Sequence, residues 1–201
     1  MRIFRPCFIA RWIFPDALFR IKTKEKLICL TFDDGPDPSS TAEILGILKN
    51  HNIRAVFFCS GDKAEKFPEL FQRIIAEGHI AGNHGYSHMN GWQNSLKKYT
   101  DDIEKASHII PGIFFRPPYG KIRLCQYMKL KKRFKIMLWD IMPYDFDTSF
   151  PPEESLRVLE RNIRPGSVIT LHDNSGSSSV LILSRFIKMA DSRGYRFVLP
   201  G

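Results

Sequence analysis

The chain has 201 residues, of which 43% are hydrophobic and 25% are charged, and its formal net charge is +9. This composition is that of an ordinary globular protein, and it excludes a mostly disordered chain, a collagen and a coiled-coil rod. The length favours one domain that can bury its own core.

Strand-like and helix-like segments alternate along the chain. The apolar runs predict strands at 27–32, 55–59, 79–82, 113–115, 134–139, 167–171 and 195–199. The periodic segments predict helices after a capping box of Ser40 with Glu43, between Pro68 and Gly78, and over 95–109, 123–130, 153–163 and 179–190.

This alternation predicts a parallel α/β fold, although the pattern alone does not separate a barrel from an open sheet. Polar clusters follow the first, third, fourth, fifth and sixth predicted strands. Side chains from so many strand ends converge only if the strands ring one mouth, which favours a barrel with its site at the C-terminal face.

Two segments carry most of the positive charge. Residues 1–26 hold seven basic and two acidic residues, and residues 121–135 hold seven basic residues and no acidic ones. Each segment could be a solvated face or could contact an anionic phospholipid surface, nucleic acid or glycan. No nucleic-acid-binding motif is present, so nucleic acid is not the expected partner.

Residues 1–26 are interpreted as a basic, aromatic lead-in to a catalytic domain at 27–201. Five aromatic residues interleave with its arginines, which suits an anionic membrane surface or packing on the body of the protein. They are Phe4, Phe8, Trp12, Phe14 and Phe19.

The four cysteines, Cys7, Cys29, Cys59 and Cys125, are scattered without a CxxC pair. This favours ordinary thiols over a disulfide framework or a thiolate zinc site. No apolar run approaches the ~20 residues of a membrane span, and no signal peptide is evident. The expected location is cytoplasmic, peripheral at the inner face of the membrane if the lead-in binds lipid, with export left open. The sequence indicates no oligomeric state.

Four residues have the spacing of a metal-assisted site. Asp33 and Asp34 follow a strand, so one carboxylate can ligate a metal while the other stays free as a base. His84 and His88 are four residues apart and can share one metal. A plain Asp-Gly turn and two surface histidines are the alternatives. Two histidines with one carboxylate leave open positions for water and substrate, as a catalytic divalent ion requires.

Further polar residues follow the later strands. Arg116 could pair with a carboxylate and keep it charged, and the rigid turn Pro117-Pro118-Tyr119 could aim a backbone N–H at an oxyanion. His172 ends an apolar strand and is a candidate general acid, with Asp145 as the group that holds it protonated. A proline-rich surface loop and a buried structural histidine are the alternatives.

The ordered motifs TFDDGP, HGYSH and RPPYG, with a late strand ending in His-Asp, span Thr31 to Asp173. In this combination the chain resembles the polysaccharide deacetylases of carbohydrate esterase family four, which have the nodulation-type chitooligosaccharide deacetylase domain. The resemblance implies a distorted (β/α)7 barrel. It also implies hydrolytic removal of N-acetyl groups from glycans that contain N-acetylglucosamine, with peptidoglycan, chitooligosaccharide and lipid-linked sugar all open.

The resemblance also implies a role for each motif residue. Asp33 would be the catalytic base, oriented by Arg116. His172 would be the general acid with Asp145 as its partner, and Tyr119 would supply the backbone oxyanion donor.

A divalent metal belongs to the implied site. Its ligands would be Asp34, His84 and His88, and the metal would be zinc, or else cobalt or nickel. Gly85 replaces a usual Ser or Thr that braces the histidine loop, and Thr170 replaces a usual Leu beside the acyl pocket. The alternative function is a catalytically silent glycan- or metal-binding module of the same fold.

Overall fold

The computed structural model describes residues 3–201, so Met1 and Arg2 of the predicted lead-in lie outside the described residues. Helices and strands alternate along the chain. In chain order they are α1 (Phe8–Ile13), β1 (Leu27–Asp33), α2 (Thr41–Asn50), β2 (Val56–Cys59), α3 (Gly61–Lys66), α4 (Pro68–Ala76), β3 (Ile80–Asn83), η1 (Gly91–Gln93), α5 (Leu96–Ser107), β4 (Phe114–Phe115), η2 (Pro118–Gly120), α6 (Leu124–Leu130), β5 (Lys135–Ile136), α7 (Pro152–Asn162), β6 (Val168–His172), α8 (Ser179–Ser192) and β7 (Arg196–Phe197).

The strands form one sheet in which every ladder is parallel. Its order is β5-β4-β3-β2-β1-β6, and β7 pairs with the first residues of β1. Strands β1, β2 and β6 are almost wholly buried, which explains why their sequences are continuous apolar runs rather than alternating ones. The predicted parallel α/β fold is confirmed.

Single bridges, rather than a full ladder, close the ring between β5 and β6. Met137 bridges Leu18 of the lead-in, and Ile141 bridges Ile169 of β6. The closed but uneven ring is the distorted barrel that the sequence predicts. It brings the C-terminal ends of β1, β3, β4 and β6 to one mouth.

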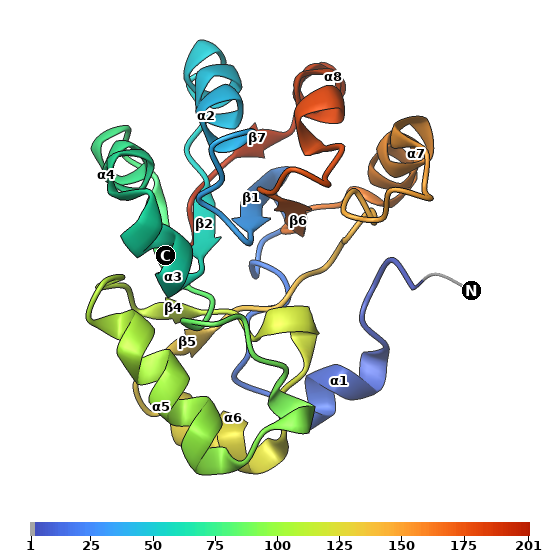
Figure 1. Cartoon of the computed structure of the whole chain (residues 1–201). Coiled ribbons are helices and arrows are strands. Elements are labelled where there is room, and N and C mark those ends of the chain that lie inside the picture. The colour runs from blue at the N-terminus through green and yellow to red at the C-terminus, as the bar shows by residue number, and fades with distance from the viewer. Residues whose placement is uncertain (1–2) are drawn as a thin grey trace.

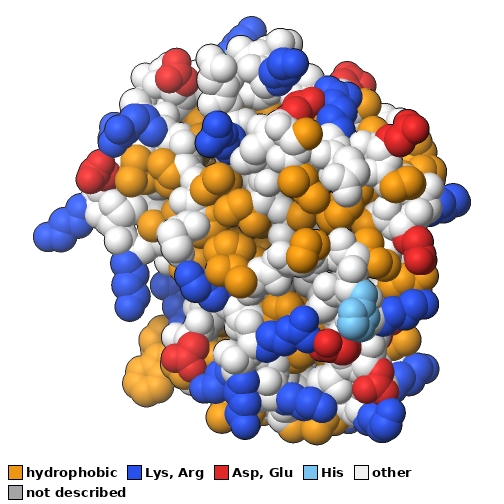
Figure 2. Space-filling view, turned by 90° about the vertical axis from the view of Figure 1, so that its left-hand side faces the viewer, with side chains coloured by type: hydrophobic (Ala, Val, Ile, Leu, Met, Phe, Trp, Pro, Cys, Tyr) orange, Lys and Arg blue, Asp and Glu red, His pale blue; other side chains and the backbone are white. Residues whose placement is uncertain are grey.

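Helices surround the strands as two groups (Figure 1). Helices α2, α4, α7 and α8 stand around β1, β2 and β6 and share the larger apolar core with them, which includes Ile44, Phe71, Leu159 and Phe186. Helices α5 and α6 cover β4 and β5 and bury a second cluster around Tyr127. Figure 2 shows one face on which apolar side chains gather near the centre, with charges of both signs around them.

Two local predictions are wrong, and two short helices were not predicted. Ser40 precedes α2, but its hydroxyl donates to Asp173 Oδ1 at 2.7 Å instead of forming a capping box. The fifth strand is shorter than 134–139, because the carbonyls of Met137 and Leu138 accept hydrogen bonds from the side chain of Arg116. Helices α1 and α3 were not predicted, because six residues are too few to show a helical period.

The lead-in packs on the body along most of its length. Phe4, Phe14 and Phe19 contact the apolar clusters or lie buried. Arg5 Nη1 donates to Asp140 Oδ2 at 2.8 Å, and the side chain of Asp140 is buried. Whether residue 26 marks a functional boundary stays a prediction. Among the described residues, no helix is both long enough and apolar enough to span a bilayer.

Candidate metal-assisted active site

A cavity of about 600 Å³ opens at the C-terminal ends of the strands. Six of the predicted site residues come together there: Asp33, Asp34, His84, His88, Tyr119 and His172 line it. The other two, Arg116 and Asp145, lie buried behind the lining. The remaining wall is largely aromatic and contains Trp139, Tyr144 and Phe146.

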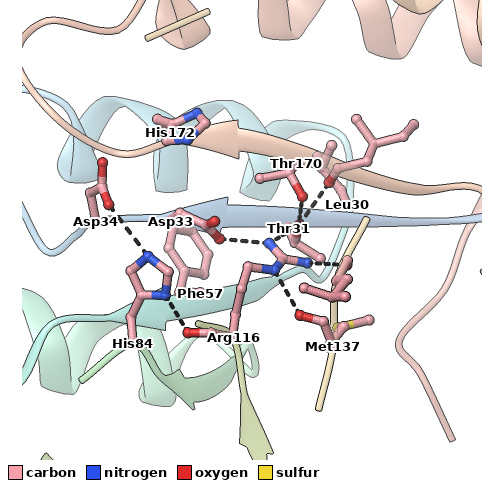
Figure 3. Close-up of polar contacts among 12 residues, drawn as sticks. Leu30, Thr31, Asp33, Asp34, Phe57, His84, Arg116, Met137, Thr170 and His172 are labelled. Carbon is pink, nitrogen blue, oxygen red and sulfur yellow. Dashed lines mark hydrogen bonds and ion pairs between the residues drawn. The ribbon is translucent and has the colours of Figure 1, made fainter. Parts of the chain in front are cut away.

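Asp33, at the end of β1, is held by an arginine that has no contact with solvent. Arg116 Nη1 donates to Asp33 Oδ1 at 2.6 Å and to Thr31 Oγ1 at 2.7 Å (Figure 3). The remaining guanidinium nitrogens donate to the carbonyls of Met137 and Leu138. Burial lowers the pKa of Arg116, and the charge of Asp33 opposes that shift. The network fixes one oxygen of Asp33 and leaves the carboxylate at the cavity wall.

Asp34, His84 and His88 form the one three-residue group with metal-ligand geometry among the described residues. Asp34 Oδ1 lies 3.5 Å from His84 Nε2 and 3.0 Å from His88 Nε2. Donor atoms that share one small divalent cation are about 3 Å to 3.5 Å apart, as Asp34 Oδ1 is from each histidine nitrogen, and all three donor atoms lie within 4.8 Å of one another. Burial would raise the pKa of Asp34, but its hydrogen bonds with both histidines hold that pKa well below its ordinary value. The carboxylate is therefore ionised, as a ligand must be.

Neighbouring groups orient two of these ligands. His84 Nδ1 lies 2.8 Å from the carbonyl oxygen of Arg116, so Nδ1 donates to that oxygen and Nε2 is the ring nitrogen that faces Asp34. Asn174 Nδ2 donates to Asp34 Oδ2 at 2.9 Å, which leaves Oδ1 toward the histidines. This arrangement is typical of metal ligands, whose outer hydrogen bonds fix their direction.

The loop that carries the histidines is braced from α5. Gly85 has a φ of +78°, and Asp102 accepts hydrogen bonds from the backbone N–H groups of Tyr86 and Ser87 at 2.9 Å and 3.1 Å. A Cβ at Gly85 would lie 3.0 Å from Asp102 Oδ2. The missing hydroxyl at position 85 therefore does not leave this loop without support, because a buried carboxylate provides it.

His172 is held by Asp145 at two points. Asp145 Oδ2 accepts from the backbone N–H of His172 at 2.7 Å, and Oδ1 lies 3.0 Å from Nδ1. Ser177 Oγ donates to the same carboxylate at 2.7 Å. Burial lowers the pKa of His172, but the charge and hydrogen bond of Asp145, aided by Asp33 and Asp34, raise it to about 9. His172 is therefore protonated at neutral pH.

One residue does not lie where the resemblance implies. Thr170 is fully buried and does not line the cavity, because its hydroxyl lies 3.2 Å from Thr31 Oγ1 in the network beneath Asp33. The implied position of Thr170 beside the acyl pocket is therefore wrong. Tyr119 has a left-handed backbone (φ +60°), and its ring packs edge-on against His88 with 4.6 Å between centroids.

The sequence did not single out three supporting residues. Asn174 directly follows the His172-Asp173 pair, and that position was its only signal. Asp102 and Ser177 carried no signal, because each is an ordinary polar residue in a segment otherwise explained as a helix or a loop.

Comparison with known proteins agrees with the family that the sequence motifs resemble. The sequence model of the polysaccharide deacetylase family matches residues 20–131. A peptidoglycan-N-acetylglucosamine deacetylase of Bacillus cereus is 38% identical over 181 residues, which cover 85% of this chain but only 66% of that relative. A chitooligosaccharide deacetylase of Azorhizobium caulinodans is 32% identical over 165 residues, covering 77% of each chain.

The fold is also similar to a solved structure. The Bc1960 peptidoglycan N-acetylglucosamine deacetylase, in complex with 4-naphthalen-1-yl-N-oxidanyl-benzamide, superimposes with a TM-score of 0.88 and 35% identity. The match covers 94% of this chain and 92% of that one.

Proposed function

This chain belongs to the polysaccharide deacetylase family, and from that premise we propose that it is a metal-dependent hydrolase of N-acetylated glycans. Its substrates would carry N-acetylglucosamine, as the names of the peptidoglycan and chitooligosaccharide relatives suggest. The observation that carries the proposal is the convergence of the carboxylate of Asp33, a three-residue ligand group and a protonated histidine on one cavity.

Asp34, His84 and His88 would hold the cation. Two histidines and one carboxylate suit zinc, and cobalt or nickel would also fit. A divalent cation bound there would polarise the acetyl carbonyl and lower the pKa of water. Zinc and the expected cytoplasmic location both stay predictions.

Asp33 would act as the general base. Water adds to the acetyl carbonyl carbon, and the carboxylate of Asp33 takes its proton. The buried hydrogen bond from Arg116 holds the carboxylate of Asp33 in one direction. The backbone N–H of Tyr119 would donate to the oxygen on which negative charge develops.

His172 would act as the general acid. With a pKa near 9 it carries a proton at neutral pH, and Asp145 holds its Nδ1 side so that Nε2 can donate. The proton goes to the departing sugar nitrogen as the C–N bond breaks. Acetate and a glucosamine unit are the products. The aromatic wall offers flat apolar surfaces for the sugar ring.

The test compares turnover with binding. Metal-loaded protein is incubated with N-acetylglucosamine oligomers and with peptidoglycan, and released acetate and new amines are both measured. Repeated turnover of either substrate, with equal amounts of acetate and new amine, supports the proposal. Stoichiometric glycan binding without acetate release from either would favour the silent module instead.

A further inference from the structure

Helix α1 turns its apolar side chains away from the protein. None of its residues is buried, and Phe8 and Trp12 contact each other edge-on with 5.9 Å between ring centroids. A surface helix normally presents its apolar face to the core and its charged face to water. The exposed side chains on α1, with their exposed fractions, are Phe8 70%, Ile9 59%, Trp12 74% and Ile13 46%.

The charged side chain of α1 instead reaches toward the body. Arg11 Nη2 lies 3.5 Å from the buried Asp140 Oδ1, and its guanidinium lies 5.7 Å from the centre of the Phe19 ring. Arg5, just before the helix, also pairs with Asp140. These contacts fix the orientation of α1, so its apolar face is held outward rather than free to turn inward.

The second basic segment lies directly beside this helix. Phe14 and Tyr127 of α6 pack edge-on with 4.9 Å between centroids, and Lys131 Nζ pairs with Asp16 Oδ2 at 2.8 Å. These contacts place residues 14–16, just after α1, against 127–131 of the second basic segment, and Figure 1 shows α1 and α6 in the same lower half of the molecule. Asp140, Asp16 and Glu104 pair with only some of the basic side chains in these segments, namely Arg5, Arg11, Lys131 and Arg133.

Helix α6 adds apolar side chains of its own. Leu124 is 55% exposed and Met128 is 47% exposed. Exposed aromatic and aliphatic groups beside a large excess of Lys and Arg match the chemistry of an anionic lipid surface, in which apolar groups enter the headgroup layer and cations pair with phosphates.

We propose that α1 and the adjoining segment 121–135 dock the protein on an anionic membrane. The N-terminal segment also touches the cavity wall, since the backbone N–H of Ile3 donates to the hydroxyl of Tyr144 at 3.1 Å. Docking would bring the cavity rim close to the lipid surface. This inference rests on the proposed function, and the substrate would then be an N-acetylated glycan attached to that membrane.

The binding test uses sedimentation with vesicles of phosphatidylcholine alone or mixed with phosphatidylglycerol. The full chain should sediment with the anionic vesicles only. A Phe8→Ser/Trp12→Ser double variant should bind about 100-fold more weakly, because it removes the two most exposed apolar side chains of α1 from the lipid contact. Leu181→Ser is the matched control, since Leu181 is 67% exposed on α8 and should not contribute.

Three outcomes would overturn the proposal. Wild-type protein could stay in the supernatant with anionic vesicles, or the double variant could sediment as fully as Leu181→Ser. The third is binding to duplex DNA that matches vesicle binding in strength and is unchanged in the double variant, since the basic side chains would then serve nucleic acid.

The same variants separate this proposal from the proposed function. The double variant should release acetate from soluble N-acetylglucosamine oligomers at the wild-type rate but lose activity on a lipid-linked acetylated glycan presented in anionic vesicles. Failure of the docking proposal would leave both activities equal in the variant and wild type. Failure of the deacetylase proposal would abolish acetate release while vesicle binding stayed intact.

Discussion

Arg116 and Asp33 form a fully enclosed ion pair, with 2.6 Å between Nη1 and Oδ1 and almost no solvent at either side chain. Asp33 nevertheless stands at the cavity wall, so the pair joins the core of the barrel to the site. The geometry ties the direction of one carboxylate to the ends of three separate segments: β1, the turn after β4 and the residues after β5.

Two substitutions of Arg116 should therefore test its contributions to stability and to catalysis separately. Arg116→Ala leaves the carboxylate buried and unpaired and should lower the free energy of unfolding by about 3–5 kcal/mol. Arg116→Lys keeps a charge but loses the bonds to Met137 and Leu138, so kcat should fall by about 100-fold in protein that still folds. Urea unfolding and steady-state kinetics measure the two effects, with the exposed Arg54→Lys as control. Wild-type kcat in folded Arg116→Lys would contradict this account of Asp33.

Asn174 should control metal affinity without being a ligand. Asn174→Ala removes the hydrogen bond that directs Asp34 Oδ2 away from the histidines, and zinc affinity should fall by about 10- to 100-fold. Competition with a chromogenic chelator measures this, and Asn50→Ala on the exposed end of α2 is the control. Unchanged affinity would show that Asp34 needs no such orientation.

Asp102 should also affect metal affinity, although it lies farther from the ion than Asn174. Asp102→Asn replaces one of the two oxygens that accept from Tyr86 and Ser87, so the free energy of unfolding should fall by about 1–3 kcal/mol. Zinc affinity should fall by about tenfold, because the loop also positions His88. The neighbouring Asp101→Asn is a matched control, since Asp101 is exposed and pairs with the equally exposed Lys97. Equal behaviour of the two variants would contradict the bracing role.

The loss of activity at alkaline pH should follow the deprotonation of His172. The account requires its protonated form, so activity is lost as pH rises through its pKa, which Asp145 helps to raise to about 9. A bound cation offsets the charge of Asp34, so the limb in holoenzyme lies at or below that value. Asp145→Asn removes the nearest negative charge and should move the alkaline limb of kcat/KM to lower pH by about one unit or more.

Ser177→Ala provides the control for that shift. It removes one hydrogen bond to Asp145 without changing the charge, so the limb should move much less. An alkaline limb that stays in place or moves upward in Asp145→Asn would show that His172 is not the acid.

Sequence predicted the parts of this site that depend on one motif at a time. Asp33, Asp34 and His84 lie at or directly after the ends of strands, and His88 follows in the same loop as His84. A parallel barrel brings strand ends together, so their meeting could be predicted. The bracing residues could not be predicted in this way. Asp102 reaches the histidine loop from the middle of α5, and that contact depends on how the helix packs rather than on any local pattern.

The same limit explains the local errors. Ser40 has the sequence of a helix cap, but a buried Asp173 competes for its hydroxyl across a distance of 133 residues. Thr170 was placed by its position beside a motif, whereas the alternation of side chains along β6 turns it toward Thr31. The direction of α1 also depends on packing, because the buried Asp140 that fixes it lies more than 120 residues away.

The most direct test of the account is acetate release measured against bound metal. Protein stripped with a chelator is reloaded with one equivalent of zinc, cobalt or nickel, and acetate from N-acetylglucosamine oligomers is followed for wild type and Asp33→Asn at equal metal content. The account predicts no release from stripped wild type, restored release with metal, and almost none from Asp33→Asn, whose three ligands are intact. Equal release from both proteins, or release that does not depend on metal, would contradict it.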